Sequence, residues 1–155
     1  MKINNMKKII LFFALIIAAI AVQAQTVNPV KWSYAAKKVS DKVYQLVITA
    51  TLPSPWHIYS QYTPDGGPKP TKIVYTKNPL LVINGVPKEN GSLKTVHDDN
   101  FGVDVKYFGE KVEFVQTVQL KTAAKTSVTG TINYMVCNDK ECLPPTKQPF
   151  EIKLQ

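Results

Sequence analysis

Alternation of apolar and polar residues with a period of two is the feature that most restricts how this 155-residue chain can fold. The pattern is clearest in residues 43–52, where one face collects apolar side chains: Tyr44, Leu46, Ile48, Ala50 and Leu52. Polar Gln45, Thr49 and Thr51 fall on the opposite face. Because successive side chains of a β-strand point to opposite faces, this segment is predicted to be a strand of an antiparallel sheet with one buried face.

Similar segments recur along the chain, rich in β-branched and aromatic residues and separated by proline, glycine, asparagine and aspartate. Strands are predicted at residues 29–38, 56–61, 72–76, 80–83, 111–120 and 127–137, and in a last segment with Phe150, Ile152 and Leu154. Turns are predicted at residues 77–79, Asn84-Gly85 and Asn90-Gly91, and an irregular loop at residues 65–70. About seven to nine short strands without a convincing helix predict an all-β fold, an immunoglobulin-like antiparallel β-sandwich.

The first 24 residues have the features of a secretory signal peptide. Three lysines precede an apolar run at residues 9–22, and the small residue Ala24 follows it. The run is shorter than the roughly 20 residues that span a bilayer, which disfavours the alternative of a retained membrane anchor. We therefore expect cleavage after Ala24 and one mature domain of residues 25–155, periplasmic or secreted, with no stable membrane span.

The positive charge of the chain comes from lysine alone. The formal net charge is +8, and loss of Lys2, Lys7 and Lys8 with the signal peptide lowers it to +5. Recognition of nucleic acids relies strongly on arginine, which can hydrogen-bond phosphates and bases with two N–H groups at once. The chain has no arginine, and its lysines are scattered rather than clustered, so we expect no nucleic-acid partner.

The only two cysteines, Cys137 and Cys142, flank the four polar residues 138–141, which suit a turn. If this turn closes a hairpin, the cysteines lie opposite each other with Cα atoms about 4.5–5.5 Å apart, within reach of a disulfide. The alternation through residues 127–137 places Cys137 on the polar face of its strand. A metal site would need further ligands, and the chain offers only His57 and His97, so we expect no metal and no organic cofactor.

Three interpretations of the cysteine pair remain at this point: a structural disulfide, a metal site with too few ligands, and a redox-active pair. A disulfide that closes so short a loop removes little entropy from the unfolded chain, so a purely structural role gains little stability. A redox role needs an accessible sulfur and a second cysteine close enough to resolve a mixed disulfide. The residues alone leave the structural and the redox interpretation open.

Residues 133–145 resemble the active-site hairpin of the N-terminal periplasmic domain of the thiol:disulfide interchange protein DsbD. In that family two cysteines flank a short polar turn, and two prolines follow soon after, as Pro144 and Pro145 do here. Residues 56–59 are similar to the family's aromatic strand, with Tyr59 as the matching tyrosine. The acidic stretch 97–102, predicted to be a loop with one exposed aromatic residue, is similar to the family's cap loop.

The resemblance implies an immunoglobulin-like fold and an electron relay through the cysteine pair. Cys142 would be the nucleophile and Cys137 the resolving cysteine, while Phe101 would cover the pair until a partner displaces it. Asp98 or Asp99 beside the sulfurs would favour the protonated, slowly reacting thiol.

The relay implies thioredoxin-fold partners and a membrane thiol-reductant transporter, both supplied by other chains. The rival function is a non-catalytic immunoglobulin-like binding or adhesion domain whose disulfide only fastens its hairpin. His57 and His97 are interpreted as surface or strand histidines rather than as acid–base groups.

Overall fold

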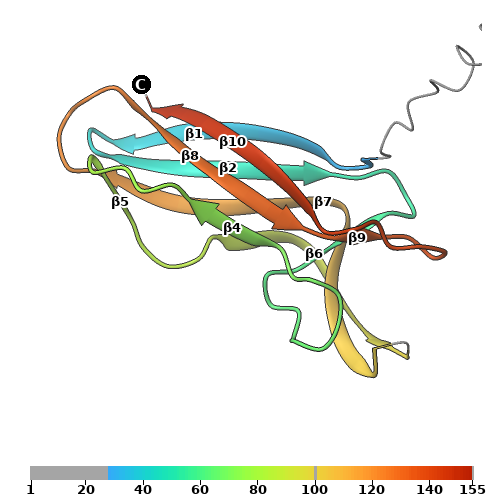
Figure 1. The fold of residues 1–155 in the computed structure, drawn as a ribbon. Helices are drawn as coiled ribbons and strands as arrows, with labels where there is room; N and C mark the ends of the chain where they lie inside the picture. The colour runs from blue at the N-terminus through green and yellow to red at the C-terminus, as the bar shows by residue number, and fades with distance from the viewer. Residues whose placement is uncertain (1–27, 100, 155) are drawn as a thin grey trace, which may run out of the picture.

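Ten β-strands make up the part of the chain that the computed structural model describes, residues 28–99 and 101–154 (Figure 1). The strands are β1 (Lys31–Ser40), β2 (Val43–Thr51), β3 (His57–Tyr59), β4 (Lys72–Tyr75), β5 (Leu81–Ile83), β6 (Lys88–Asp98), β7 (Val103–Leu120), β8 (Thr126–Tyr134), β9 (Val136–Cys137) and β10 (Thr146–Leu154). The predicted signal peptide lies outside the described residues. None of the described segments forms a helix with the length and apolar character needed to cross a bilayer.

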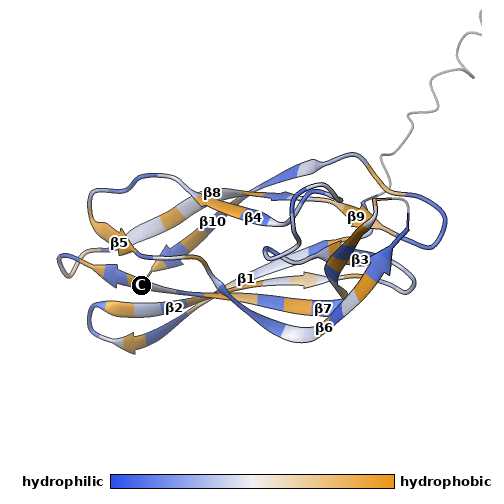
Figure 2. Ribbon diagram, turned by 90° about the horizontal axis from the view of Figure 1, so that it is seen from below, coloured by the Kyte–Doolittle hydropathy of each residue, from blue (hydrophilic) through white to orange (hydrophobic). Residues whose placement is uncertain are grey.

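The strands form two antiparallel sheets that pack face to face. The larger sheet has the order β1-β2-β7-β3-β9, and β5 and β6 also pair with β7. The smaller sheet has the order β10-β8-β4. Figure 2 shows the two layers one above the other, with hydrophobic and hydrophilic residues alternating along the strands. The predicted immunoglobulin-like β-sandwich is confirmed.

The main core fills the space between the two sheets and follows the period-two pattern. Along β2 every second side chain is buried, as the sequence predicts. Aromatic rings from β1 connect the layers: Trp32 packs edge-on against Tyr134 of β8, with ring centroids 5.2 Å apart, and Tyr34 stacks on Phe150 of β10. The core therefore fixes the smaller sheet over the larger one.

Strand β7 is long enough to pair with different strands of the larger sheet along its length. Its 18 residues pair first with β3, through Gly109 opposite His57, and then with β2, from Lys111 opposite Thr51. Between these two partners Glu110 has a φ of 51°, and its carbonyl accepts a 2.7 Å hydrogen bond from the N–H of Leu52. Figure 1 shows β7 curving away from the sandwich together with β6. This curved hairpin forms one wall of the candidate site.

The turn predicted at Asn90-Gly91 is wrong, because both residues lie within β6, opposite Glu113 and Val112. A Cβ atom at Gly91 would lie only 3.0 Å from the Lys111 carbonyl oxygen. Glycine therefore allows β6 and β7 to approach each other closely here and does not form a turn. Strand β6 was missed because nearly all its side chains are exposed, which leaves no apolar alternation. With β6 included, the strands outnumber the predicted range by one.

Candidate functional site

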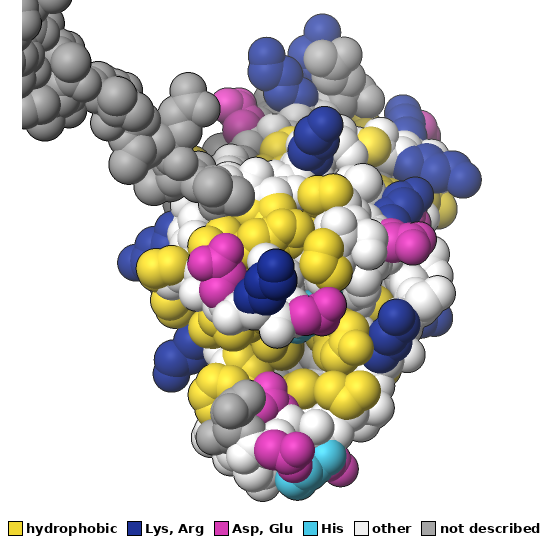
Figure 3. Space-filling model, turned by 90° about the vertical axis from the view of Figure 1, so that its right-hand side faces the viewer, with side chains coloured by type: hydrophobic (Ala, Val, Ile, Leu, Met, Phe, Trp, Pro, Cys, Tyr) yellow, Lys and Arg dark blue, Asp and Glu magenta, His cyan; other side chains and the backbone are white. Residues whose placement is uncertain are grey.

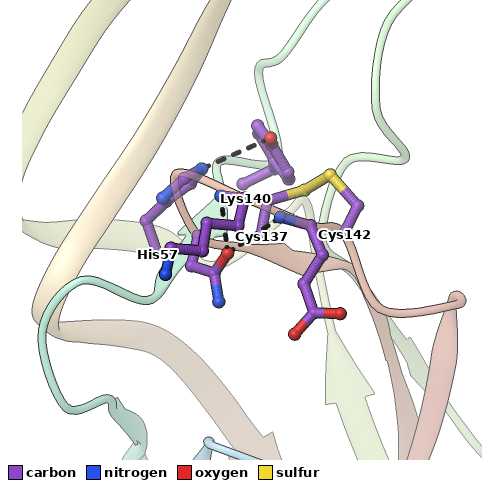
Figure 4. Close-up of a disulfide and its surroundings, with 7 residues drawn as sticks. His57, Cys137, Lys140 and Cys142 are labelled. Atoms are coloured by element: carbon purple, nitrogen blue, oxygen red, sulfur yellow. Dashed lines mark hydrogen bonds between the residues drawn. A yellow bond between two sulfur atoms is a disulfide. The ribbon is translucent and has the colours of Figure 1, made fainter.

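The predicted cysteine hairpin and its disulfide are confirmed. Cys137 and Cys142 face each other as an isolated antiparallel pair and form a disulfide, with Cα atoms 4.0 Å apart (Figure 4). Two backbone hydrogen bonds of 2.9 Å close the hairpin, from Asn138 N–H to the Glu141 carbonyl and from Leu143 N–H to the Val136 carbonyl. The pair therefore sits at the base of a short, fully hydrogen-bonded turn.

The side chain of Asn138 holds this turn from within. Its Oδ1 accepts hydrogen bonds from the backbone N–H of Lys140 at 2.8 Å and of Glu141 at 2.9 Å. Asparagine commonly stabilises a turn in this way, by replacing a backbone acceptor with its own amide oxygen. Both donors are exposed, so the turn presents its polar groups to solvent while it keeps the cysteines together.

The two cysteines differ strongly in exposure. The prediction that Cys137 lies on a polar face is wrong: only 2% of its surface is exposed, whereas Cys142 is exposed. The alternation breaks at Met135, where the chain leaves the smaller sheet and β9 pairs with β3 of the larger one. At β9 both faces are covered, so Val136 faces the main core and Cys137 packs into a second cluster on the other face. An incoming thiol therefore meets Cys142 first.

The second cluster consists of buried Tyr59, Val105 and Cys137, with partly buried Val103, Tyr107 and Met135 packed against them. Its members come from β3, β7, β9 and the β8–β9 connection. The cluster thus surrounds the inner cysteine with apolar and aromatic side chains.

Residues 60–71, which we call the covering loop, close over this cluster. A side chain at Gly67 would lie 3.1 Å from Val103, so the loop backbone approaches β7 closely there. The hydroxyl of Thr71 donates a 2.5 Å hydrogen bond to the Tyr59 carbonyl, and that of Thr63 donates a 2.6 Å bond to the Lys106 carbonyl. These contacts fasten both ends of the loop to the strands that it covers.

His57 and Tyr59 place two polar groups beside the cluster. Nε2 of His57 lies 3.4 Å from the Tyr59 hydroxyl. The imidazole ring of His57 also packs against the ring of Tyr107, with a distance of 4.4 Å between the two ring centroids. Burial, followed by the charge of Asp98 and by Tyr107, raises the pKa of Tyr59 to about 12. Burial also lowers the pKa of His57 below its ordinary value. Both side chains are therefore neutral at neutral pH.

The predicted cap residues lie on the β6–β7 hairpin. Asp98 ends β6 half-buried, near enough for its charge to act on Tyr59, and its carbonyl accepts hydrogen bonds from Phe101 N–H at 3.2 Å and Gly102 N–H at 2.7 Å. Gly102 has a φ of 66°, which suits this tight turn. Asp99 is exposed, and Phe101, 41% exposed, lies outside the buried cluster. The structure thus brings Asp98 to the tyrosine and leaves Asp99 and Phe101 at the hairpin tip.

Sequence reasoning missed three parts of this site. His57 was interpreted without a functional role, although it lies two residues before Tyr59 and so on the same strand face. The sequence predicts an irregular loop at residues 65–70 but not that it covers the cluster, and the cluster residue Val105 gave no sequence signal, because the partners of both are distant in the chain. Within the described ranges, no three His, Cys, Asp or Glu side chains stand close enough together to hold a metal ion.

Comparison with protein-family models identifies one family, and comparison with solved structures finds similar folds. The family model described as "Thiol:disulfide interchange protein DsbD, N-terminal" matches residues 23–154. No curated protein matches the chain. Among solved structures, the reduced N-terminal domain of DsbD from Neisseria meningitidis is similar over 80% of this chain and 84% of its own, with 17% sequence identity and a TM-score of 0.52.

Two further structures show the same fold. The N-terminal periplasmic domain of ScsB from Proteus mirabilis is similar over 84% of this chain and 48% of its own, with 15% identity and a TM-score of 0.55. The third comes from the complex between the DsbD N-terminal and the PilB N-terminal domains of Neisseria meningitidis. It covers 82% of this chain and 87% of its own, with 15% identity and a TM-score of 0.51.

Proposed function

The chain belongs to the family of the N-terminal domain of the thiol:disulfide interchange protein DsbD, and from this premise we propose that it relays electrons between proteins through a reversible Cys137–Cys142 disulfide. The family and the disulfide together support a thiol:disulfide exchange module. The observation that carries the proposal is the unequal exposure of the two sulfur-bearing residues, since Cys142 is exposed and Cys137 is buried. Exchange needs one cysteine that a partner can reach and a second one held beside it.

In the proposed reaction Cys142 forms the bond to the partner. The Cys142 thiolate of the reduced module attacks a partner disulfide, and one partner sulfur leaves as a thiolate. Cys137 then attacks the Cys142 sulfur of this mixed disulfide and forms the intrachain bond. The second partner sulfur leaves as a thiolate, so two electrons have passed to the partner. Reduction of the module runs through the same steps in reverse.

The partners in this proposal are thioredoxin-fold proteins and a membrane thiol-reductant transporter, which other chains supply, in the periplasm. One of the similar solved structures, from Neisseria meningitidis, comes from a complex between a DsbD N-terminal domain and a PilB N-terminal domain. This complex supports the proposal that the partner of the present chain is a protein. Figure 3 views the end of the molecule toward which the cysteine hairpin points (Figure 1). Hydrophobic side chains make up much of this end, with single charged ones among them, and such a surface suits transient docking.

The cap residues complete the proposal. Phe101 at the tip of the β6–β7 hairpin shields the reduced cysteines until a partner displaces it. Asp98 and Asp99 on the same hairpin keep the resting thiols protonated by their negative charge. Tyr59 gives the inner cysteine a neutral neighbour, which its high pKa supports.

The reduction potential of the Cys137–Cys142 pair tests the proposal. The protein is equilibrated against thiol buffers of known potential, and the fraction of disulfide is measured by alkylation and mass. A potential above about −250 mV lies among exchangeable disulfides and is the result we expect. A potential below about −300 mV would place the bond among structural disulfides and would favour the binding or adhesion domain instead.

A further inference from the structure

His57 lies directly opposite Cys137. The two residues are register partners in the antiparallel pairing of β3 with β9, and Figure 4 shows His57 beside the disulfide. Directly opposed residues of antiparallel strands project to the same face, with Cβ atoms about 4.5–5.5 Å apart. Tyr59 follows two residues later and projects to that face too. An imidazole, a phenol and the inner cysteine are therefore gathered on one face of the larger sheet.

Hydrogen bonds orient the imidazole toward the phenol. His57 makes a hydrogen bond with the backbone of Pro55, and because proline has no N–H, the imidazole donates and the carbonyl accepts. In the neutral ring the other nitrogen then carries a lone pair. Nε2, 3.4 Å from the Tyr59 hydroxyl, accepts its proton in a hydrogen bond. The packing of the Tyr107 ring against the imidazole keeps this orientation.

The chemistry of the disulfide requires a proton at Cys137. When a partner attacks exposed Cys142, Cys137 is the leaving group and receives the electron pair of the broken bond. Its surroundings are apolar and aromatic, and only 2% of its surface is exposed, so a thiolate there is poorly solvated. A nearby proton donor therefore assists the departure of this sulfur.

We propose that His57 is the proton reservoir for Cys137 and that the Tyr59 hydroxyl connects the two, an inference that rests on the proposed exchange function. As the Cys137–Cys142 bond breaks, the imidazolium gives its Nε2 proton to the Tyr59 oxygen, and the Tyr59 hydroxyl proton passes to the Cys137 sulfur. His57 and Tyr59 end neutral, and Cys137 ends as a thiol. When the disulfide re-forms, the proton returns along the same path, and the partner leaves as a thiolate.

Several other charged or titratable groups face His57. They are Tyr59 on β3, Lys94 and Asp98 on β6, Tyr107 and Glu110 on β7, and Asp139 in the hairpin turn. Burial is the largest influence on His57 and lowers its pKa below the ordinary value of 6.5, so neutral imidazole is the main form at neutral pH and the imidazolium fraction grows as the pH falls. Proton donation by His57 therefore grows as the pH falls.

The test measures the rate at which dithiothreitol reduces the oxidised protein, from about pH 8 down to about pH 4.5, a range that spans the titration of imidazole. Wild type is compared with His57→Gln at each pH by dividing the rate constant of wild type by that of the variant. The ionisation of the reductant affects both rate constants equally and cancels in this ratio. We expect the ratio to rise by about tenfold or more as the pH falls, as general acid catalysis would give. His97→Gln is the matched control, because exposed His97 pairs with Asp104 instead; its ratio to wild type should stay flat.

A flat ratio for His57→Gln would overturn the proposal. Tyr59→Phe keeps the packed ring and lacks the hydroxyl, so the rate constant of wild type divided by that of Tyr59→Phe should rise toward low pH as steeply as it does for His57→Gln. This variant also provides the test if His57→Gln does not fold, and a flat ratio for Tyr59→Phe would overturn the proton path. A wild-type disulfide that the reductant leaves intact at every pH would count against the exchange function itself, whereas exchange with a flat ratio counts against His57 alone.

Discussion

Phe101 is an exposed aromatic residue at the tip of the β6–β7 hairpin. An aromatic ring that is 41% exposed at a turn tip makes few contacts that would hold it in place. The turn itself is tight, because the Asp98 carbonyl accepts hydrogen bonds from Phe101 and Gly102. A ring carried on a firm turn can cover a reactive group and still yield to a partner.

We predict that Phe101→Ala makes the reduced cysteines easier to modify. Alkylation of the reduced protein by iodoacetamide should become at least about threefold faster, because access controls thiol reactivity. Val39→Ala removes an exposed side chain of similar character from β1 and should leave the rate unchanged. Equal alkylation rates for both variants would contradict a capping role.

At the scale of the element, β8 is the central strand of the smaller sheet and leads directly into the cysteine hairpin. Gly130 lies between β4 and β10, and a Cβ there would meet the Val74 carbonyl oxygen at 2.5 Å and the Phe150 ring at 2.7 Å. Neither neighbour can move without disturbing a sheet or the core. Glycine at this position therefore allows the three strands and the Phe150 ring to pack together.

We predict that Gly130→Ala destabilises the fold by about 1–3 kcal/mol, the usual cost of overpacking. The free energy of unfolding is measured by urea denaturation. Gly109→Ala is the control, since a Cβ at Gly109 would meet nothing within 4 Å, and its stability should be close to that of the wild type. The packing argument is wrong if the two variants lose the same stability.

At the scale of the whole molecule, a single carboxylate joins the edge of the larger sheet to the covering loop. Glu89 of β6 accepts 2.7 Å hydrogen bonds from the hydroxyl of Ser60 and from the backbone N–H of Gln61. Ser60 is fully buried, at the point where the chain leaves β3 for the loop. This contact holds the β6–β7 hairpin, β3 and the covering loop together.

We predict that Glu89→Gln destabilises the protein by about 1–2 kcal/mol, because hydrogen bonds to a charged acceptor are stronger than those to an amide. The backbone amide of Gln61 should exchange faster with deuterium, since it loses the carboxylate acceptor. Glu113→Gln is the matched control on β7, where the carboxylate contacts Lys111 and Asn90 near the surface and contributes little. Unchanged exchange at Gln61 would show that the loop is held by its other contacts.

Local patterns in the sequence determined the fold class and the position of the disulfide. Alternation along β2 and β8 predicts strands correctly, because each strand buries one face and exposes the other. Apolar side chains then recur at every second residue of the sequence. The four polar residues between the cysteines predict the hairpin, since turn formation depends on adjacent residues only. The resemblance of residues 133–145 to the DsbD family agrees with the family that the chain belongs to.

Only the tertiary structure decided what surrounds the two cysteines. Cys137 is buried because β9 pairs with the larger sheet and Cys137 packs into the second cluster with Tyr59 and Val105, and neither event leaves a periodic signal. Edge strand β6 is nearly all exposed and could not be recognised by alternation. His57 meets Cys137 through pairing between strands about 80 residues apart in sequence. Such non-local pairing depends on the packing of the whole chain, so the sequence predicts the disulfide-bonded pair but not the side chains that surround it.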